Sequence, residues 1–175
     1  PGAHERVLTF ADCGVLPDPT AEQLAEIACL AADRHQRLTR EVPHVAMLSF
    51  SNFGNPPGIV ANTMVEAKIL MDAAAAENAI DFEFDGEMSV EVALDSDRSM
   101  YPFCKLTGPA NVLIMPGLHS ATISTRLVQN FGAATTIGPM LMGFVKPVQI
   151  VSMDATVSDL VQMALMAAHA SPKQS

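Results

Sequence analysis

The stretch HVAMLSFSNFGNPPG, residues 44–58, decides the fold class of this 175-residue chain. Its first half is a continuous apolar run, too short for a helix and typical of a strand buried on both faces. Asn, Gly and Pro then break the run. Residues 59–78 follow as an alanine-rich segment with apolar residues at helical spacing. The order strand, loop, helix predicts one α/β unit.

The same order recurs along the chain. We expect further strands at 7–10, 80–88 and 110–116, and further helices over 20–38, 90–94, 120–131 and 156–170. Thr20 with Gln23 forms a capping-box signal for the first of these helices. Because the strand runs are continuous rather than alternating, we expect an α/β fold, a mostly parallel sheet sandwiched by helices. Ligands of such sheets bind beyond the carboxyl ends of the strands, here the loops after Ser51, Pro116 and Ser152.

Composition excludes several classes of partner. The net charge is −9 and no basic cluster interleaves with aromatic residues, so nucleic acid and anionic membranes are poor partners. No apolar run is long enough to span a bilayer. Cys13, Cys29 and Cys104 lie far apart without a CxxC pair, which is typical of reduced thiols in a cytoplasmic protein. The five histidines lack zinc-ligand spacing, so we expect no metal site.

Four polar features have two interpretations each. Ser49, Ser51 and Asn52 follow a buried strand, where their loop could cradle a phosphate, although an ordinary turn explains them better. The FDGEM stretch, residues 84–88, holds two carboxylates that could act as a pair or end a solvated strand. His119 and Ser120 are adjacent, which favours a polar helix cap over a nucleophile. Asp159 follows Thr156 by three residues, so capping alone would explain it.

Five ordered blocks carry a family resemblance. They are ADCGVLPDPTAEQLAEIA (11–28), VAMLSFSNFG (45–54), FDGEM (84–88), GPANVLIMPGL (108–118) and IGPMLMGFVKPVQIVS (137–152). Together they resemble the phosphotransacetylase family, the phosphate acetyl/butyryl transferases, over about residues 7–170. The resemblance implies two α/β domains with the active cleft between them. Residues 1–144 would be the second domain, and residues 145–175 the strand and helix that return to an otherwise missing first domain. The chain would then be the tail of a longer protein.

The resemblance also implies a site. Family members have Ser-Arg and a later Asp facing acyl-CoA and phosphate, and the matching positions here are Ser152, Met153 and Asp159. A second family arginine matches Asn130. A thioether carries no charge and donates no hydrogen bond, so it cannot replace a guanidinium that neutralises acetyl phosphate. We therefore expect no catalytic residues. The expected acetyl-CoA-binding residues are Ser152, Asp159, Asn130, Met153, Ser49, Ser51 and Asn52.

Three blocks resemble one branch of the family. SFSNFG, FDGEM and HSATISTRLVQNFG (119–132) are similar to the phosphotransacetylase-like domain at the C-terminus of long bacterial NADP-dependent malic enzymes. That resemblance implies a parent enzyme whose upstream domains oxidise malate to pyruvate with NADP and a divalent metal, Mg or Mn. This segment would be a regulatory and oligomerisation domain that senses acetyl-CoA and assembles as a homodimer or higher homo-oligomer. Two alternatives stay open, a fragment of a true phosphate acetyltransferase and an assembly module without a ligand.

Overall fold

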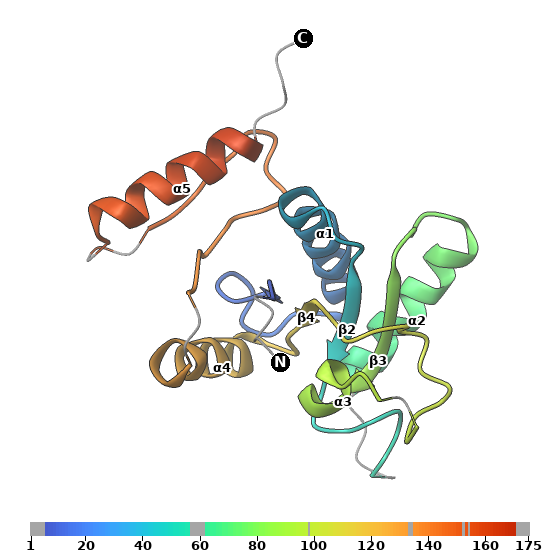
Figure 1. Cartoon of the computed structure of the whole chain (residues 1–175). Coiled ribbons are helices and arrows are strands. Elements are labelled where there is room, and N and C mark those ends of the chain that lie inside the picture. The colour runs from blue at the N-terminus through green and yellow to red at the C-terminus, as the bar shows by residue number, and fades with distance from the viewer. Residues whose placement is uncertain are drawn as a thin grey trace. The chain divides into compact units, whose positions relative to one another are not determined.

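The computed structural model describes residues 6–56, 62–97, 99–132, 135–151, 153 and 155–170, and Figure 1 shows their elements in chain order. The chain forms two compact units, residues 1–123 and 124–175. The described elements are β1 (Thr9–Ala11), α1 (Ala21–Thr39), β2 (His44–Leu48), α2 (Asn62–Ala76), β3 (Glu83–Met88), α3 (Val90–Leu94), β4 (Val112–Ile114), α4 (Leu118–Phe131) and α5 (Val157–Ala170).

The four strands form one sheet in the order β1-β4-β2-β3, and every pairing is parallel. Val112 of β4 lies between Thr9 of β1 and Val45 of β2, and Val45 also pairs with Phe84 of β3. The α/β class and the parallel sheet expected from the apolar runs are confirmed. The first strand begins two residues later and ends one residue later than expected, at Thr9–Ala11, and α3 has the bounds expected for it.

Helices and loops cover both faces of the sheet. On one face, α1 packs against β1, β4 and β2, and α2 packs against α1, β2 and β3. On the other face α3, the segment before β4 and the first turns of α4 enclose an apolar cluster. Its buried members are Ala46, Leu48, Met88, Ala93, Leu106, Ala110, Leu113, Met115 and Ala121. A fully buried leucine or methionine of this kind stabilises the fold by about 1.5–3 kcal/mol.

The first long helix begins as its sequence predicts. Thr20 Oγ1 accepts a hydrogen bond from the backbone N–H of Gln23 at 3.3 Å, and Gln23 Oε1 accepts one from Thr20 N–H at 2.9 Å. The capping box is confirmed. The helix ends where Arg40 takes a left-handed conformation with φ 66° and donates its N–H to the Gln36 carbonyl.

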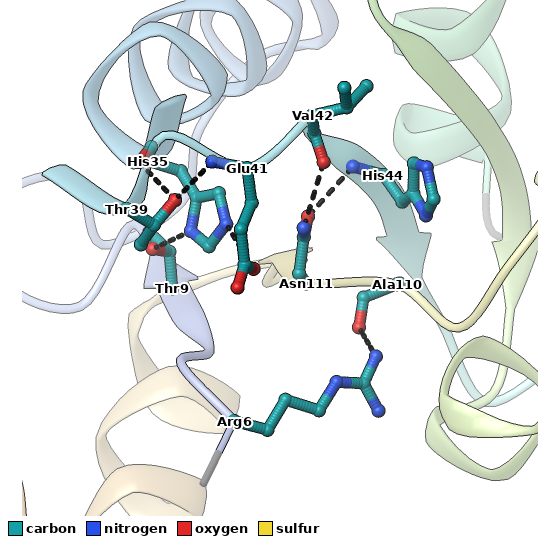
Figure 2. Close-up of polar contacts among 9 residues, drawn as sticks. All are labelled: Arg6, Thr9, His35, Thr39, Glu41, Val42, His44, Ala110 and Asn111. Atoms are coloured by element: carbon teal, nitrogen blue, oxygen red, sulfur yellow. Dashed lines mark hydrogen bonds and ion pairs between the residues drawn. The ribbon is translucent and has the colours of Figure 1, made fainter. Parts of the chain in front are cut away.

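Polar side chains fasten the amino edge of the sheet, shown in Figure 2. Asn111 donates its amide N–H to the Val42 carbonyl at 2.9 Å and accepts the His44 N–H at 2.7 Å, which ties β4 to the entry of β2. His35 of α1 is buried, and its Nδ1 lies 2.9 Å from Thr9 Oγ1. Burial lowers the pKa of His35, and the opposing Glu41 carboxylate, 3.8 Å from Nε2, offsets only part of that shift. At neutral pH the His35 side chain is therefore a neutral imidazole that lies beside the Glu41 carboxylate.

The unit of residues 124–175 contains the end of α4 and the whole of α5. The helix expected from residue 156 to 170 is confirmed. The strand expected before this helix is not seen in the described residues 135–151, where Met140 and Gln149 form an isolated antiparallel bridge. The domain boundary expected between residues 144 and 145 stays a prediction. Within the described residues, no helix combines the length and the apolar character needed to cross a bilayer.

Candidate ligand-binding site

Three loops of the first unit lie at the carboxyl edge of the parallel sheet, where ligands of such sheets bind. The loop after β1 is organised by Asp12, whose carboxylate accepts the backbone N–H groups of Gly14, Val15 and Leu16 at 2.7, 3.1 and 2.8 Å. A carboxylate that accepts three backbone N–H groups of the residues that follow it stabilises the turn that they form. Asp12 is a structural residue that sequence reasoning did not single out.

The loop after β2 holds three of the expected ligand-binding residues. Ser51 is buried, and its hydroxyl lies 3.2 Å from that of Ser49. Asn52 accepts the Ser89 N–H on its side-chain oxygen at 2.7 Å. The structure thus brings Ser49, Ser51 and Asn52 together. Some of their side-chain hydrogen bonds are made to other groups of the protein. Their role toward a ligand stays a prediction.

The backbone N–H groups of residues 51–55 in this loop also have acceptors within the protein. Ser51 N–H reaches Ser49 Oγ at 3.4 Å, and the next four N–H groups, of residues 52–55, donate to Asn55 O, Glu87 O, Glu87 Oε1 and Asn52 O. A phosphate cradle needs such groups to point at the ligand. Over the described part of this loop, which ends at Pro56, the geometry therefore favours the ordinary turn over the phosphate loop.

The two carboxylates of FDGEM are buried and have separate partners. Glu87 Oε1 accepts the Ser51 hydroxyl at 3.1 Å and the Gly54 N–H at 2.6 Å. Asp85 accepts the Lys105 N–H at 2.7 Å, and its other oxygen lies 3.8 Å from Lys68 Nζ. The solvated strand end is wrong, because exposed fractions are only 3% for Asp85 and 4% for Glu87. Each carboxylate holds a different loop to the edge strand β3.

The loop after β4 leads directly into α4. Ser120 donates its hydroxyl to the Gly117 carbonyl at 2.8 Å, and His119 is exposed to solvent. Ser120 is the third residue of α4 and bonds back to a carbonyl instead of accepting a free N–H of the first turn. The interpretation of this pair as a polar cap therefore stays a prediction. Leu118 N–H donates to the Pro17 carbonyl at 3.2 Å, so the loops after β1 and β4 are joined.

Three other expected residues belong to the unit of residues 124–175. Asn130 donates its amide N–H to the Arg126 carbonyl at 2.8 Å, one turn earlier in α4. Met153 is fully exposed. Asp159 accepts both the N–H and the hydroxyl of Thr156 at 2.8 Å, while Thr156 Oγ1 accepts the Asp159 N–H at 3.3 Å. Capping accounts for Asp159 in this structure. Ser152 lies outside the described residues.

The half-buried thiols near the sheet are not activated. Burial, with a smaller contribution from Asp12, raises the pKa of Cys13 to about 11, and burial likewise raises the pKa of Cys29. A thiol acts as a nucleophile in its thiolate form, so both groups are unreactive at neutral pH. This agrees with the expectation of reduced thiols, although Cys13 and Cys29 are only partly buried.

Fold and site define an α/β domain of the phosphotransacetylase type. The structure matches the EutD phosphotransacetylase from Staphylococcus aureus with a TM-score of 0.87 and 29% sequence identity, covering 95% of this chain and 51% of that one. The chain belongs to the phosphate acetyl/butyryl transferase family, since the family model described as phosphate acetyl/butaryl transferase matches residues 2–168. The resemblance in the five sequence blocks is confirmed.

Two kinds of protein are found among the curated relatives. An NADP-dependent malic enzyme of Rhizobium meliloti is 48% identical over 165 residues, which are 94% of this chain and 21% of that protein. A phosphate acetyltransferase of Clostridium acetobutylicum is 37% identical over 162 residues, 91% of this chain and 47% of that protein. The chain thus spans about a fifth of the malic enzyme and about half of the acetyltransferase.

Proposed function

We propose that this chain is a regulatory and oligomerisation domain of an NADP-dependent malic enzyme, which oxidises malate to pyruvate. In this proposal it senses acetyl-CoA and carries out no acetyl transfer. One observation carries the proposal: over nearly the same residues, the chain is 48% identical to a malic enzyme and 37% identical to a phosphate acetyltransferase. Relatives of the first kind also include proteins from Rickettsia prowazekii and Salmonella typhimurium.

The chemistry of the changed positions supports a silent domain. Transfer of acetyl to phosphate builds negative charge that needs cationic or strong hydrogen-bond donors, and loss of one such donor costs roughly 10²- to 10³-fold in rate. Met153 has neither a charge nor a hydrogen-bond donor, and Asn130 donates an amide N–H to the Arg126 carbonyl of its own helix. Asp159, which would deprotonate a thiol by resemblance, is engaged in the cap of α5.

The further parts of this proposal concern the complete protein. NADP and a divalent metal, Mg or Mn, would bind in domains upstream of this sequence. Acetyl-CoA would be the effector at Ser152, Asp159, Asn130, Met153, Ser49, Ser51 and Asn52. The protein would assemble as a homodimer or higher homo-oligomer in the cytoplasm. Acetyl-CoA binding and malate oxidation would then be coupled reciprocally.

The second candidate is a fragment of a phosphate acetyltransferase. It is favoured by the 37% identity to several acetyltransferases and by the match to the Staphylococcus aureus structure. An assembly module without a ligand is the third. The three differ in whether the complete protein oxidises malate and whether it responds to acetyl-CoA.

The test is malate-dependent NADP reduction by the complete gene product, titrated with acetyl-CoA, beside a version truncated before Val7. We expect a response to acetyl-CoA that disappears on truncation. Malate oxidation indifferent to acetyl-CoA would leave the assembly module. No malate oxidation, with acetyl phosphate formed from acetyl-CoA and phosphate, would establish the acetyltransferase instead.

A matched variant tests the silent site. Met153→Arg alone should restore no acetyl phosphate formation, because Asn130 is changed as well and Asp159 still caps α5. The wild-type protein is its control. Acetyl phosphate formation in this single variant would show that the site is only one substitution from activity.

A further inference from the structure

His35 is a buried histidine that no part of the candidate site uses. Its side chain has no exposed surface, and its Nδ1 lies 2.9 Å from Thr9 Oγ1. Among the described residues, Nε2 has no hydrogen-bond partner. It faces the carboxylate of Glu41, whose Oε2 is 3.8 Å away, as Figure 2 shows. A buried ring nitrogen that stops short of a carboxylate calls for a physical explanation, because such nitrogens are normally hydrogen-bonded.

The two contacts assign the hydrogen of the neutral ring. A hydrogen on Nδ1 would leave the Nε2 lone pair facing a carboxylate oxygen, and both of those groups are acceptors. A hydrogen on Nε2 points toward the carboxylate instead, and Nδ1 then accepts the Thr9 hydroxyl. The neutral ring therefore carries its hydrogen on Nε2. At 3.8 Å this N–H is attracted to Glu41 but is too far away for a hydrogen bond.

Protonation of the ring changes both contacts. An imidazolium has an N–H on each nitrogen, so Nδ1 must donate to Thr9 Oγ1 and the hydroxyl hydrogen of Thr9 must turn away. Nε2–H then belongs to a cation, and the facing carboxylate becomes its counter-ion. Since charge-assisted N–H···O bonds are about 2.7–2.9 Å long, the Glu41 carboxylate has to approach by about 1 Å.

Only the side chain of Glu41 has to move for this approach. That side chain is 57% exposed, so solvent leaves it free to rotate. Its backbone is held, because the Glu41 N–H donates to Thr39 Oγ1 at 3.1 Å and the Thr39 hydroxyl donates to the His35 carbonyl at 2.8 Å. Beyond it, the Val42 carbonyl accepts the Asn111 amide. The turn between α1 and β2 therefore stays in place while the carboxylate closes.

Glu41 has no competitor for His35 among the contacts of the surrounding elements. Val112 of β4 and Val45 of β2 stand beside Thr9 in the sheet and are fully buried. Arg34 precedes His35 on α1, where adjacent side chains point in different directions. Other charged side chains of these elements contact different groups or solvent: Arg37 with Asp33, Lys68 with Asp72, His44 with Glu83, Arg6 with the Ala110 carbonyl, and Glu66 and Arg40 exposed.

We propose that His35 and Glu41 form a proton-operated clasp, in which the Glu41 carboxylate stays apart from the neutral ring and closes onto the imidazolium when His35 takes up a proton. The clasp joins the last turns of α1 to the turn that leads into β2. Acid would tighten this link and so limit the loss of stability that a buried cation causes. The inference uses only contacts within residues 1–123 and does not rest on the proposed function.

The experiment follows the titration of His35 in the complete gene product, by deuterium exchange at the C2 hydrogen of its ring and mass spectrometry. Burial lowers the pKa of His35 from its ordinary 6.5, and Glu41 opposes that shift. We therefore expect a wild-type midpoint below 6.5 and a still lower midpoint in Glu41→Gln, which keeps the shape but loses the charge. Glu26→Gln, at an exposed carboxylate of α1, is the matched control and should leave the midpoint unchanged.

Backbone amide exchange separates a clasp from a merely structural contact. In peptides from residues 36–44, Glu41→Gln should exchange roughly threefold to tenfold faster than the wild type at about pH 5, the effect of losing one hydrogen bond. At about pH 7.5, where the clasp is open, the two proteins should agree within about twofold. Glu41→Asp keeps the charge on a shorter side chain, so its midpoint should lie between those of the wild type and Glu41→Gln.

Three results would overturn the clasp. The first is a His35 midpoint that Glu41→Gln leaves unchanged or raises, and the second is a midpoint that Glu26→Gln lowers equally. The third is faster amide exchange of Glu41→Gln at both pH values, which would mean that Glu41 only supports the turn. None of these results depends on whether the complete protein responds to acetyl-CoA, so this inference and the proposed function fail separately.

Discussion

The two compact units contain similar sequence signals for helices, but they differ in how many apolar side chains they bury. Residues 1–123 place the strands and the inner faces of α1 and α2 in a dense core, with Leu24, Val45, Met47 and Ile114 fully buried. Among the described residues of 124–175, Met163 is the one buried apolar side chain, while Val145, Val157 and Leu165 are exposed. A helix can therefore follow from sequence pattern alone, whereas a core needs a second surface.

The largest expected effect is a loss of stability, and it compares one leucine from each unit. Leu113→Ala, at a side chain 1% exposed, should lower the free energy of unfolding by roughly 2–5 kcal/mol, because it leaves a cavity between β4 and its covering segments. Leu165→Ala, 64% exposed on α5, should change it by less than about 0.5 kcal/mol. Urea denaturation of both variants gives the comparison. Equal losses would mean that the exposed face of α5 is covered in solution.

The next effect tests how closely β3 approaches β2. A Cβ added to Gly86 would lie 2.7 Å from the Met47 Cβ and carbonyl oxygen, and Gly86 has φ +148°. Gly86→Ala should cost roughly 2–3 kcal/mol through overpacking and backbone strain. Gly14→Ala is the matched control, since nothing lies within 4 Å of its added Cβ. A stable Gly86→Ala protein would refute the close approach.

A smaller effect compares the same capping motif in the two units. Thr20→Ala removes the acceptor for Gln23 N–H and should cost about 1 kcal/mol in the unfolding of the sheet unit, because α1 packs on that sheet. Thr156→Ala removes the equivalent acceptor in α5. Its loss should appear as faster hydrogen exchange of α5 amides, with β2 and β4 unaffected. Thr20→Ser, which keeps the hydroxyl, is the control. The comparison also requires that, in the wild-type protein, the backbone amides of β2 exchange their hydrogens more slowly than those of α5.

The smallest effect is a pH dependence of the sheet unit. Burial lowers the pKa of His35 below its ordinary 6.5, so the unfolded chain binds the proton more readily than the folded one. The free energy of unfolding should therefore fall as the pH drops below about 6.5, and the slope between about pH 7.5 and about pH 5.5 should be smaller in His35→Gln. His169→Gln, at an exposed histidine of α5, should keep the wild-type slope. Identical slopes in all three proteins would contradict the buried neutral imidazole.

Short-range sequence signals were sufficient to predict most of the helices and strands. The capping pairs Thr20–Gln23 and Thr156–Asp159, the breaks at Gly and Pro, and the continuous apolar runs predicted α1, α3 and α5 to within a residue or so and the four parallel strands to within about three residues. Each of these signals depends on residues within a few positions of one another. The same local character explains Asp159, for which capping was the simpler prediction. Family membership followed from five blocks in order, a signal that needs no coordinates.

Long-range partnerships were decided only by the tertiary structure. Ser51 and Glu87 are 36 residues apart, and His44 and Asn111 are 67 apart, so no spacing rule could pair them. Their contacts arise because β2 takes its place between β4 and β3, and that order depends on how whole faces pack. The chain therefore predicts which segments become strands and helices from their own residues. Which carboxylate is buried, and which hydroxyl it orients, is settled when those segments meet.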